Sequence, residues 1–102
     1  MTKERWNQMS ISEQMINIGG ELERAIRWRD KNDTEKALNF LAKAEERLEL
    51  TKQDEKNKGR LGELSLAQEE IEDFFADNQW QNDNDSIMKY WNSFLSSRML
   101  SV

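Results

Sequence analysis

Four acidic side chains have the spacing that a magnesium site on two neighbouring helices requires. Glu46 and Glu49 lie three residues apart, and Glu70 and Asp73 repeat that spacing further along the chain. Residues three apart face the same side of a helix, so each pair can place two carboxylates together, and Mg²⁺ prefers carboxylate oxygens as ligands. The pattern is therefore compatible with a magnesium site for metal-assisted hydrolysis.

This spacing resembles that of the MazG-type nucleotide pyrophosphohydrolases, which are all-α. Two observations disfavour such a site in this chain. The sequence has 20 acidic residues among 102, so these spacings also arise by chance. A helical wheel places Glu46 nearly opposite Leu48 and Asp73 nearly opposite Leu64, which turns both carboxylates toward solvent. We therefore assign no catalytic and no metal-binding residue, and keep the hydrolase as an alternative.

The sequence contains neither cysteine nor histidine, which removes several classes of site. No disulfide, thiolate ligand, imidazole ligand or Ser-His-Asp arrangement can form. Di-iron bundles use Glu-x-x-His ligands, and bundle ribonucleases of the HEPN type use an Arg…His motif, so both lack a necessary residue here. A HEPN-like bundle that binds RNA without the catalytic histidine is a second alternative. No cofactor is expected.

A basic cluster with an aromatic residue in its middle is the candidate partner-binding site: Arg24, Arg27, Trp28 and Arg29. Arginine beside an exposed ring can bind phosphate and stack a base, and a helical wheel leaves Trp28 exposed. The alternative is a solvated face on which Glu21 and Glu23 offset the charge. The net charge of -5 disfavours nucleic acid and anionic membranes, so the expected partner is a protein.

Composition and periodicity predict an all-α fold. The chain has no proline and only four glycines, and its apolar residues recur at steps of three and four. We expect one domain, residues 1–102, folded as a four-helix up-and-down antiparallel bundle with a short N-terminal arm. The arm covers residues 1–9, and the helices cover about residues 11–29, 35–52, 59–77 and 86–98.

Capping residues set these boundaries. Ser10 or Ser12 would cap the first helix, Asp33 or Thr34 the second, and Asp83 or Asp85 the fourth. Gly19 falls inside the first helix, at the edge of its apolar stripe, which indicates close approach of another helix. Residues 53–58 have no apolar content and are predicted to form a solvated loop.

Several side chains are expected to face the core or to pair there. The inward positions of the later helices include Leu38, Leu61 and Leu95, and Trp80 is expected to fold back from its loop as a plug. Three arginines lie in line with apolar stripes, and two acids lie on stripe edges: Arg29, Arg60 and Arg98, with Glu45 and Glu72. We expect arginine–carboxylate pairs there, with a ligand site as the alternative.

Two surface features bear on partners. Between Arg60 and Lys89 there are eight acidic residues and no basic one. This acidic segment could attract a basic partner or simply stay solvated. Four aromatic residues provide more aromatic surface than the core of a small bundle needs: Trp6, Trp28, Trp80 and Tyr90. Exposure of any two would indicate a protein interface. A homodimer is the commonest form of such an interface.

Two resemblances concern the helical pattern. The segment Asn32–Leu38, followed by Phe40, Lys43, Ala44 and Leu48, resembles the turn and second helix of a tetratricopeptide repeat, although no second copy follows at about 34 residues. A wider resemblance, to a family of small, uncharacterised, all-helical bacterial proteins, is carried by Ser12, Gln14, Ile18, Gly19, Arg24, Ala25, Ile26, Trp28, Ala44, Leu48, Leu50, Thr51, Arg60, Leu61, Glu63 and Leu64. Residues 65–69 lack the basic residue expected in that family. The resemblance implies a bacterial cytoplasmic bundle without an established activity.

The sequence thus favours a non-enzymatic helical-bundle protein that binds a partner. We expect a homodimer or another protein partner. No stretch has the length and apolar character of a signal peptide or a membrane span, so the expected location is the cytoplasm, without membrane contact.

Overall fold

The computed structural model describes the backbone of residues 2–100 and the side chains of residues 2–95. Within that range the secondary structure is entirely helical: α1 (Lys3–Asn7), α2 (Ile11–Asp30), α3 (Thr34–Gln53), the 3₁₀ helix η1 (Glu55–Arg60), α4 (Leu61–Phe75) and α5 (Asn84–Leu100). The prediction of an all-α fold is confirmed, and four of the five α-helices are long.

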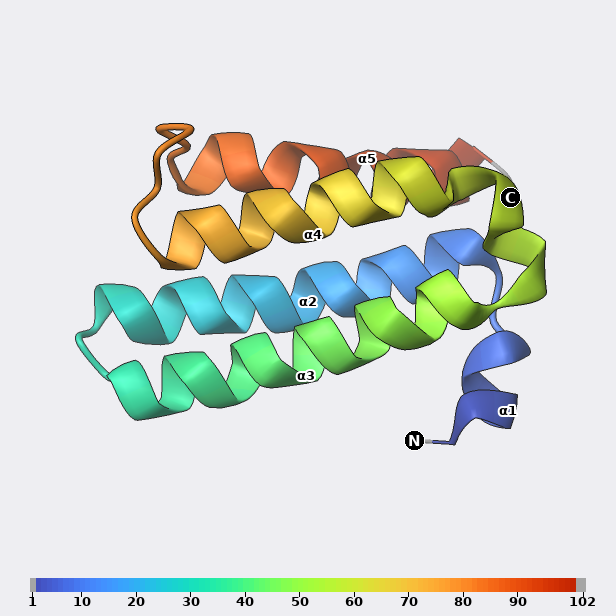
Figure 1. The fold of residues 1–102 in the computed structure, drawn as a ribbon, viewed down its shortest axis with the longest axis horizontal. Coiled ribbons are helices and arrows are strands. Elements are labelled where there is room, and N and C mark those ends of the chain that lie inside the picture. The colour runs from blue at the N-terminus through green and yellow to red at the C-terminus, as the bar shows by residue number, and fades with distance from the viewer. Residues whose placement is uncertain (1, 101–102) are drawn as a thin grey trace.

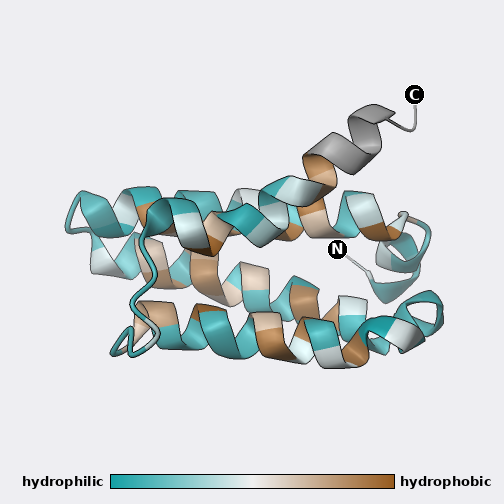
Figure 2. Cartoon of the chain, turned by 90° about the horizontal axis from the view of Figure 1, so that it is seen from above, coloured by the Kyte–Doolittle hydropathy of each residue, from teal (hydrophilic) through white to brown (hydrophobic). Residues whose placement is uncertain are grey.

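The long helices enclose one core. α2 contacts α3 and α5, and α4 contacts the same two helices. Figure 1 shows α4 and α5 lying together above α2 and α3, with α1 near the end of α3. Figure 2 shows hydrophobic residues on the helices and hydrophilic residues in the loops that join them. Fully buried side chains at the centre include Met15, Ile18, Leu22, Leu48, Leu64 and Ile71. No helix within residues 2–100 is both long and apolar enough to cross a membrane.

The predicted caps are confirmed, and the structure selects one residue from each pair. Ser10 Oγ accepts a hydrogen bond from the Glu13 N–H at 3.1 Å. Asp33 Oδ1 accepts from the Lys36 N–H at 3.1 Å, and Asp83 Oδ1 accepts from the Ser86 N–H at 2.8 Å. Each cap satisfies one of the backbone donors that a helix start leaves unpaired.

Close approach of another helix at Gly19 is also confirmed. A Cβ atom built at Gly19 would lie 3.1 Å from the Cβ of Trp91, so α5 can sit this near to α2 only because residue 19 has no side chain. The next residue, Gly20, has more room, since its Cβ would lie 3.5 Å from Arg24 Nη1.

Residues 53–58 do not form the solvated loop that was predicted. η1 occupies most of the segment, and two of its polar side chains, Asp54 and Asn57, are buried with exposed fractions of 6% and 1%. Polar groups can be buried when their hydrogen-bonding capacity is satisfied, so a sequence without apolar residues can still pack inside.

The predicted inward placement of four large side chains is wrong. Leu38, Leu61, Leu95 and Trp80 are exposed, and Trp80 retains 51% of its surface. The polar backbone of its loop, not the ring, faces α4, because the Asp73 carboxylate accepts hydrogen bonds from the Gln79 and Trp80 N–H groups at 2.8 and 3.0 Å. The three leucines belong neither to the buried core cluster nor to the partly buried hydrophobic residues that pack against it.

Candidate functional site

The residues of the basic cluster do not form one surface. Arg24 and Arg27 are exposed on α2, and each already has a partner. Arg24 Nη1 lies 3.3 Å from Glu21 Oε1. Arg27 Nη2 lies 3.1 Å from Glu23 Oε1. Exposed pairs of this kind add little to stability, but they offset the positive charge that an approaching molecule would meet.

Trp28 is not exposed as the helical wheel predicts. The residue is half-buried, because two lysines from the α2–α3 turn region cover its ring. Lys31 Nζ lies 4.9 Å and Lys36 Nζ 4.1 Å from the ring centroid, which are cation–π distances. The indole is thus engaged within its own chain and offers little free face for stacking a base.

Arg29 points toward α4 and joins three elements. Its guanidinium carbon lies 4.3 Å from the ring centroid of Phe74 and 5.1 Å from that of Phe75. Arg29 also donates hydrogen bonds to the Phe74 carbonyl oxygen at 3.4 Å and to Asn84 Oδ1 at 3.2 Å. A cation at a helix C-terminus is favoured by the helix dipole. Arg29 is therefore best explained as a structural residue that links α2, α4 and α5.

The expected arginine–carboxylate pairs are therefore only partly present. Arg60 pairs with Glu63 at 3.3 Å on the surface, and the side chain of Arg98 lies outside the described residues. Glu45 and Glu72 lie beside each other instead of beside an arginine. Burial raises the pKa of Glu45, and the neighbouring Glu72 carboxylate raises it further.

The carboxylates with magnesium-site spacing are dispersed. Glu46 and Glu49 are exposed on α3, Asp73 binds the loop backbone, and Glu70 lies on the rim of a pocket beside α5. Within the described part of the chain, no group of three or more His, Cys, Asp or Glu residues is placed to hold a metal ion.

A buried polar network that was not predicted fastens the N-terminal arm. Trp6 Nε1 donates to Thr51 Oγ1 at 2.9 Å. Gln14 Nε2 donates to the Trp6 carbonyl oxygen at 2.8 Å and to Asp54 Oδ2 at 2.9 Å. Asn57 Nδ2 donates to Gln14 Oε1 and to the Thr51 carbonyl oxygen, both at 2.9 Å. Because these side chains satisfy one another's hydrogen-bonding capacity, we interpret the network as structural and not as a ligand site.

Lys56 adds an ion pair to this network. Its ammonium group pairs with Asp54 and donates to the Asn7 carbonyl oxygen at 2.9 Å. Burial alone would raise the pKa of Asp54, but hydrogen bonds from Lys56 and Gln14 outweigh it and hold the pKa below its ordinary value. The folded state therefore favours the ionised form of Asp54.

This shift predicts a pH dependence of stability. A carboxylate with a lowered folded-state pKa contributes stability that is present above its unfolded pKa, about 3.9, and is lost as the pH falls through the folded value. The Asp54→Asn variant should be less stable at pH 7, and its free energy of unfolding should fall less steeply than that of the wild type below pH 4. Urea unfolding at a series of pH values measures both. Parallel pH curves for the two proteins would contradict this account.

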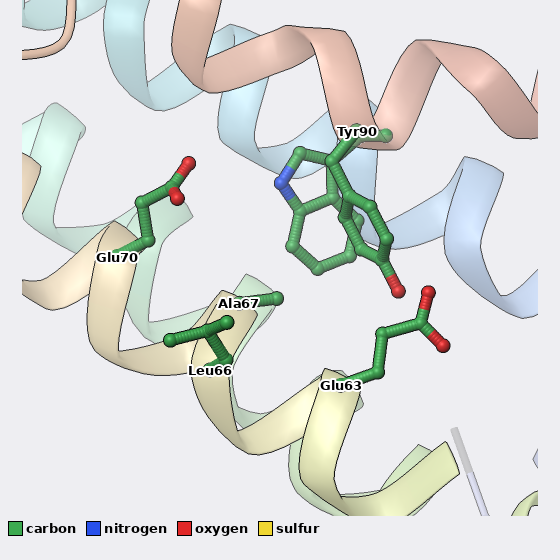
Figure 3. Close-up of a pocket in the computed structure, with 6 residues that line it drawn as sticks. Glu63, Leu66, Ala67, Glu70 and Tyr90 are labelled. Atoms are coloured by element: carbon green, nitrogen blue, oxygen red, sulfur yellow. The ribbon is translucent and has the colours of Figure 1, made fainter.

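A pocket with a mainly apolar lining lies between α4 and α5 (Figure 3). Its walls come from Glu63, Leu66, Ala67, Glu70, Tyr90 and Trp91. It has a volume of about 130 Å³. The four α4 residues follow the spacing of one helix face, and α5 contributes two adjacent aromatic rings. Leu66 remains 58% exposed at its edge.

Tyr90 and Glu63 meet at one end of this pocket. Figure 3 shows the Tyr90 hydroxyl pointing toward the Glu63 carboxylate, and burial followed by the negative charge of Glu63 raises the pKa of Tyr90. The phenol therefore stays protonated at neutral pH. Its oxygen is buried and has no hydrogen-bond partner among the described residues.

Comparison with known proteins yields no match to a family model, to a curated protein or to a solved structure. The site must therefore be interpreted from its own residues.

Proposed function

We propose that this protein is a cytoplasmic, non-enzymatic interaction module that presents the α4–α5 surface to a protein partner. In this proposal the four long helices form an up-and-down antiparallel bundle. Support for that arrangement comes from the contacts of α2 with α3 and α5 and of α4 with the same two helices, because such contacts close a ring of neighbours.

The pocket between α4 and α5 is the observation that supports this function best. It combines an apolar, aromatic interior with an exposed leucine, Leu66, at its edge. Surfaces of this kind are typical of interface centres, where aromatic residues are enriched and a side chain of the partner fills a pocket. The partner is a second copy of the chain or a different protein.

Two leucine variants test this function. Light scattering over a range of concentrations, with affinity capture from cells that express the protein, should reveal a dimer or a bound partner. Leu66→Gln should weaken that association about tenfold or more, because it places a polar group in the apolar surface that the partner covers. Leu38→Gln is the matched control, since Leu38 is 55% exposed on α3, away from the pocket. A strictly monomeric protein that captures nothing would contradict the proposal, as would equal effects of the two variants.

A further inference from the structure

We infer that the α4–α5 pocket receives one lysine or arginine side chain from a basic segment of a different protein. This inference rests on the proposed function, because it specifies the partner of the same surface. Four features support it. They are the size of the pocket, its apolar walls, the carboxylates at its rim and the excess negative charge of α4.

The pocket is too small for a nucleotide or a typical cofactor. Its volume is about 130 Å³, whereas small-molecule sites usually enclose roughly 300–1,000 Å³. An engineered protein cavity of about 150 Å³ holds a single benzene molecule. The pocket therefore has room for one side chain of a partner.

Its walls and rim suit a side chain that is apolar along its length and cationic at its end. Leu66, Ala67 and Trp91 provide apolar walls. Figure 3 shows Glu63 and Glu70 on either side of Leu66 and Ala67. Lysine and arginine bury an aliphatic stem while the charged head stays near the surface. There, either glutamate can accept a charge-assisted hydrogen bond. An acidic side chain would be repelled, and an aliphatic one would leave Glu70, which forms no ion pair within the described residues, without a cationic partner.

Tyr90 gives a second, independent reason for a donor group. Its buried hydroxyl oxygen accepts no hydrogen bond within the described residues, and its O–H is directed toward the Glu63 carboxylate, so the lone pairs of the oxygen remain available to a donor. An ammonium or guanidinium group entering the pocket can donate to this oxygen. The aromatic ring itself attracts a cation placed over its face.

Charge decides between a second copy and a different protein. From residue 61 to residue 88 the chain has eight acidic residues and no basic one. Of the acids on α4, only Glu63 forms an ion pair within the described residues. A second copy is a poor partner, because it carries the same acidic segment and the same net charge of -5, and two like-charged copies repel each other. Charge complementarity therefore favours a different, basic protein.

Titration of the full chain with a designed peptide tests the inference. The probe is an amphipathic helix made of leucine and lysine, and its matched controls carry glutamine or glutamate at every lysine position. We expect the lysine peptide to bind and to shift the amide NMR signals of Glu63, Ala67 and Tyr90. The two control peptides should leave these signals in place. Equal affinity for the glutamine peptide would overturn the inference, since it would show that charge is not recognised.

Two glutamate variants separate the pocket from the general charge of α4. Glu70→Gln removes a carboxylate from the rim and should weaken binding of the lysine peptide about tenfold, because a charge-assisted hydrogen bond is lost. Glu69→Gln removes the same charge from an exposed neighbour outside the pocket and should change the affinity less than about twofold. Equal losses in the two variants would overturn the inference. Circular dichroism confirms that both remain folded.

Two further outcomes identify which idea has failed. If n-butylammonium shifts the pocket signals and the lysine peptide does not, the ligand is a small amine and a protein partner for this pocket is wrong. If Leu66→Gln disrupts association while no basic peptide binds at the pocket, the interaction function stands and the cationic partner is wrong. If the lysine peptide binds and Glu70→Gln weakens it selectively, the inference is supported even when the native partner is unidentified.

Discussion

Replacement of Trp6 by alanine should lower the free energy of unfolding by about 3–5 kcal/mol. Small domains have total stabilities of roughly 5–15 kcal/mol, so this single change would remove a large share. Trp6 is fully buried although it lies in a helix of five residues. A helix this short is not stable by itself, and the indole ring provides the apolar contact that holds it against α3.

The loss would extend beyond the ring. Trp6 donates to Thr51 and its carbonyl oxygen accepts from Gln14, so undocking of α1 exposes the polar network that also contains Asn57 and Asp54. Each buried polar group that loses its partner adds about 1–3 kcal/mol unless water replaces the bond. We therefore expect the arm and η1 to loosen together, which hydrogen exchange of their backbone amides would detect.

Urea unfolding of three variants measures this effect against matched controls. Trp6→Phe keeps most of the apolar contact and loses the indole N–H, so it should cost less than the alanine variant but still about 1 kcal/mol or more. Trp80→Ala removes the same side chain from an exposed site and should change stability by no more than about 0.5 kcal/mol. If Trp6→Ala costs no more than Trp80→Ala, the arm is not docked in solution.

The positions of the four long helices could be predicted because apolar periodicity and capping residues are local signals. Ser10, Asp33 and Asp83 each act within a few residues of their own position, and the structure confirms all three. The docking of Trp6 and the burial of Asn57 could not be predicted in this way. Their partners lie 45 and 43 residues away in the chain, and a polar residue gives no periodic signal when hydrogen bonds bury it.

The candidate site was predictable only in part, for a similar reason. The acidic character of α4 is visible in the sequence, and the spacing of Glu63, Leu66 and Glu70 marks one face of a helix. What completes the pocket is Tyr90 with Trp91 on α5, and this requires knowledge of which helices pack together. Likewise, the adjacency of Trp28 and Arg29 in the sequence suggested one surface, whereas consecutive helical residues face different neighbours.

Replacement of Gly19 by leucine should destabilise the protein strongly compared with the same change at Gly20. Both positions lie inside α2, so both variants gain about 1 kcal/mol of helix propensity, and that gain cancels in the comparison. At residue 19 even the first side-chain atom would lie 3.1 Å from Trp91 Cβ, and the leucine must push α5 away. Overpacking of this kind costs about 1–3 kcal/mol, which urea unfolding of the two variants would measure as their difference.

Gly20→Leu should be neutral or stabilising, because a Cβ atom there meets only the flexible end of Arg24 at 3.5 Å. The effect at Gly19 should also reach the binding surface, since Trp91 lines the α4–α5 pocket. We expect Gly19→Leu to weaken binding of the lysine peptide and Gly20→Leu to preserve it. Equal stability and equal binding in the two variants would show that α5 does not approach α2 at Gly19, and the geometry of the pocket would then have to be revised.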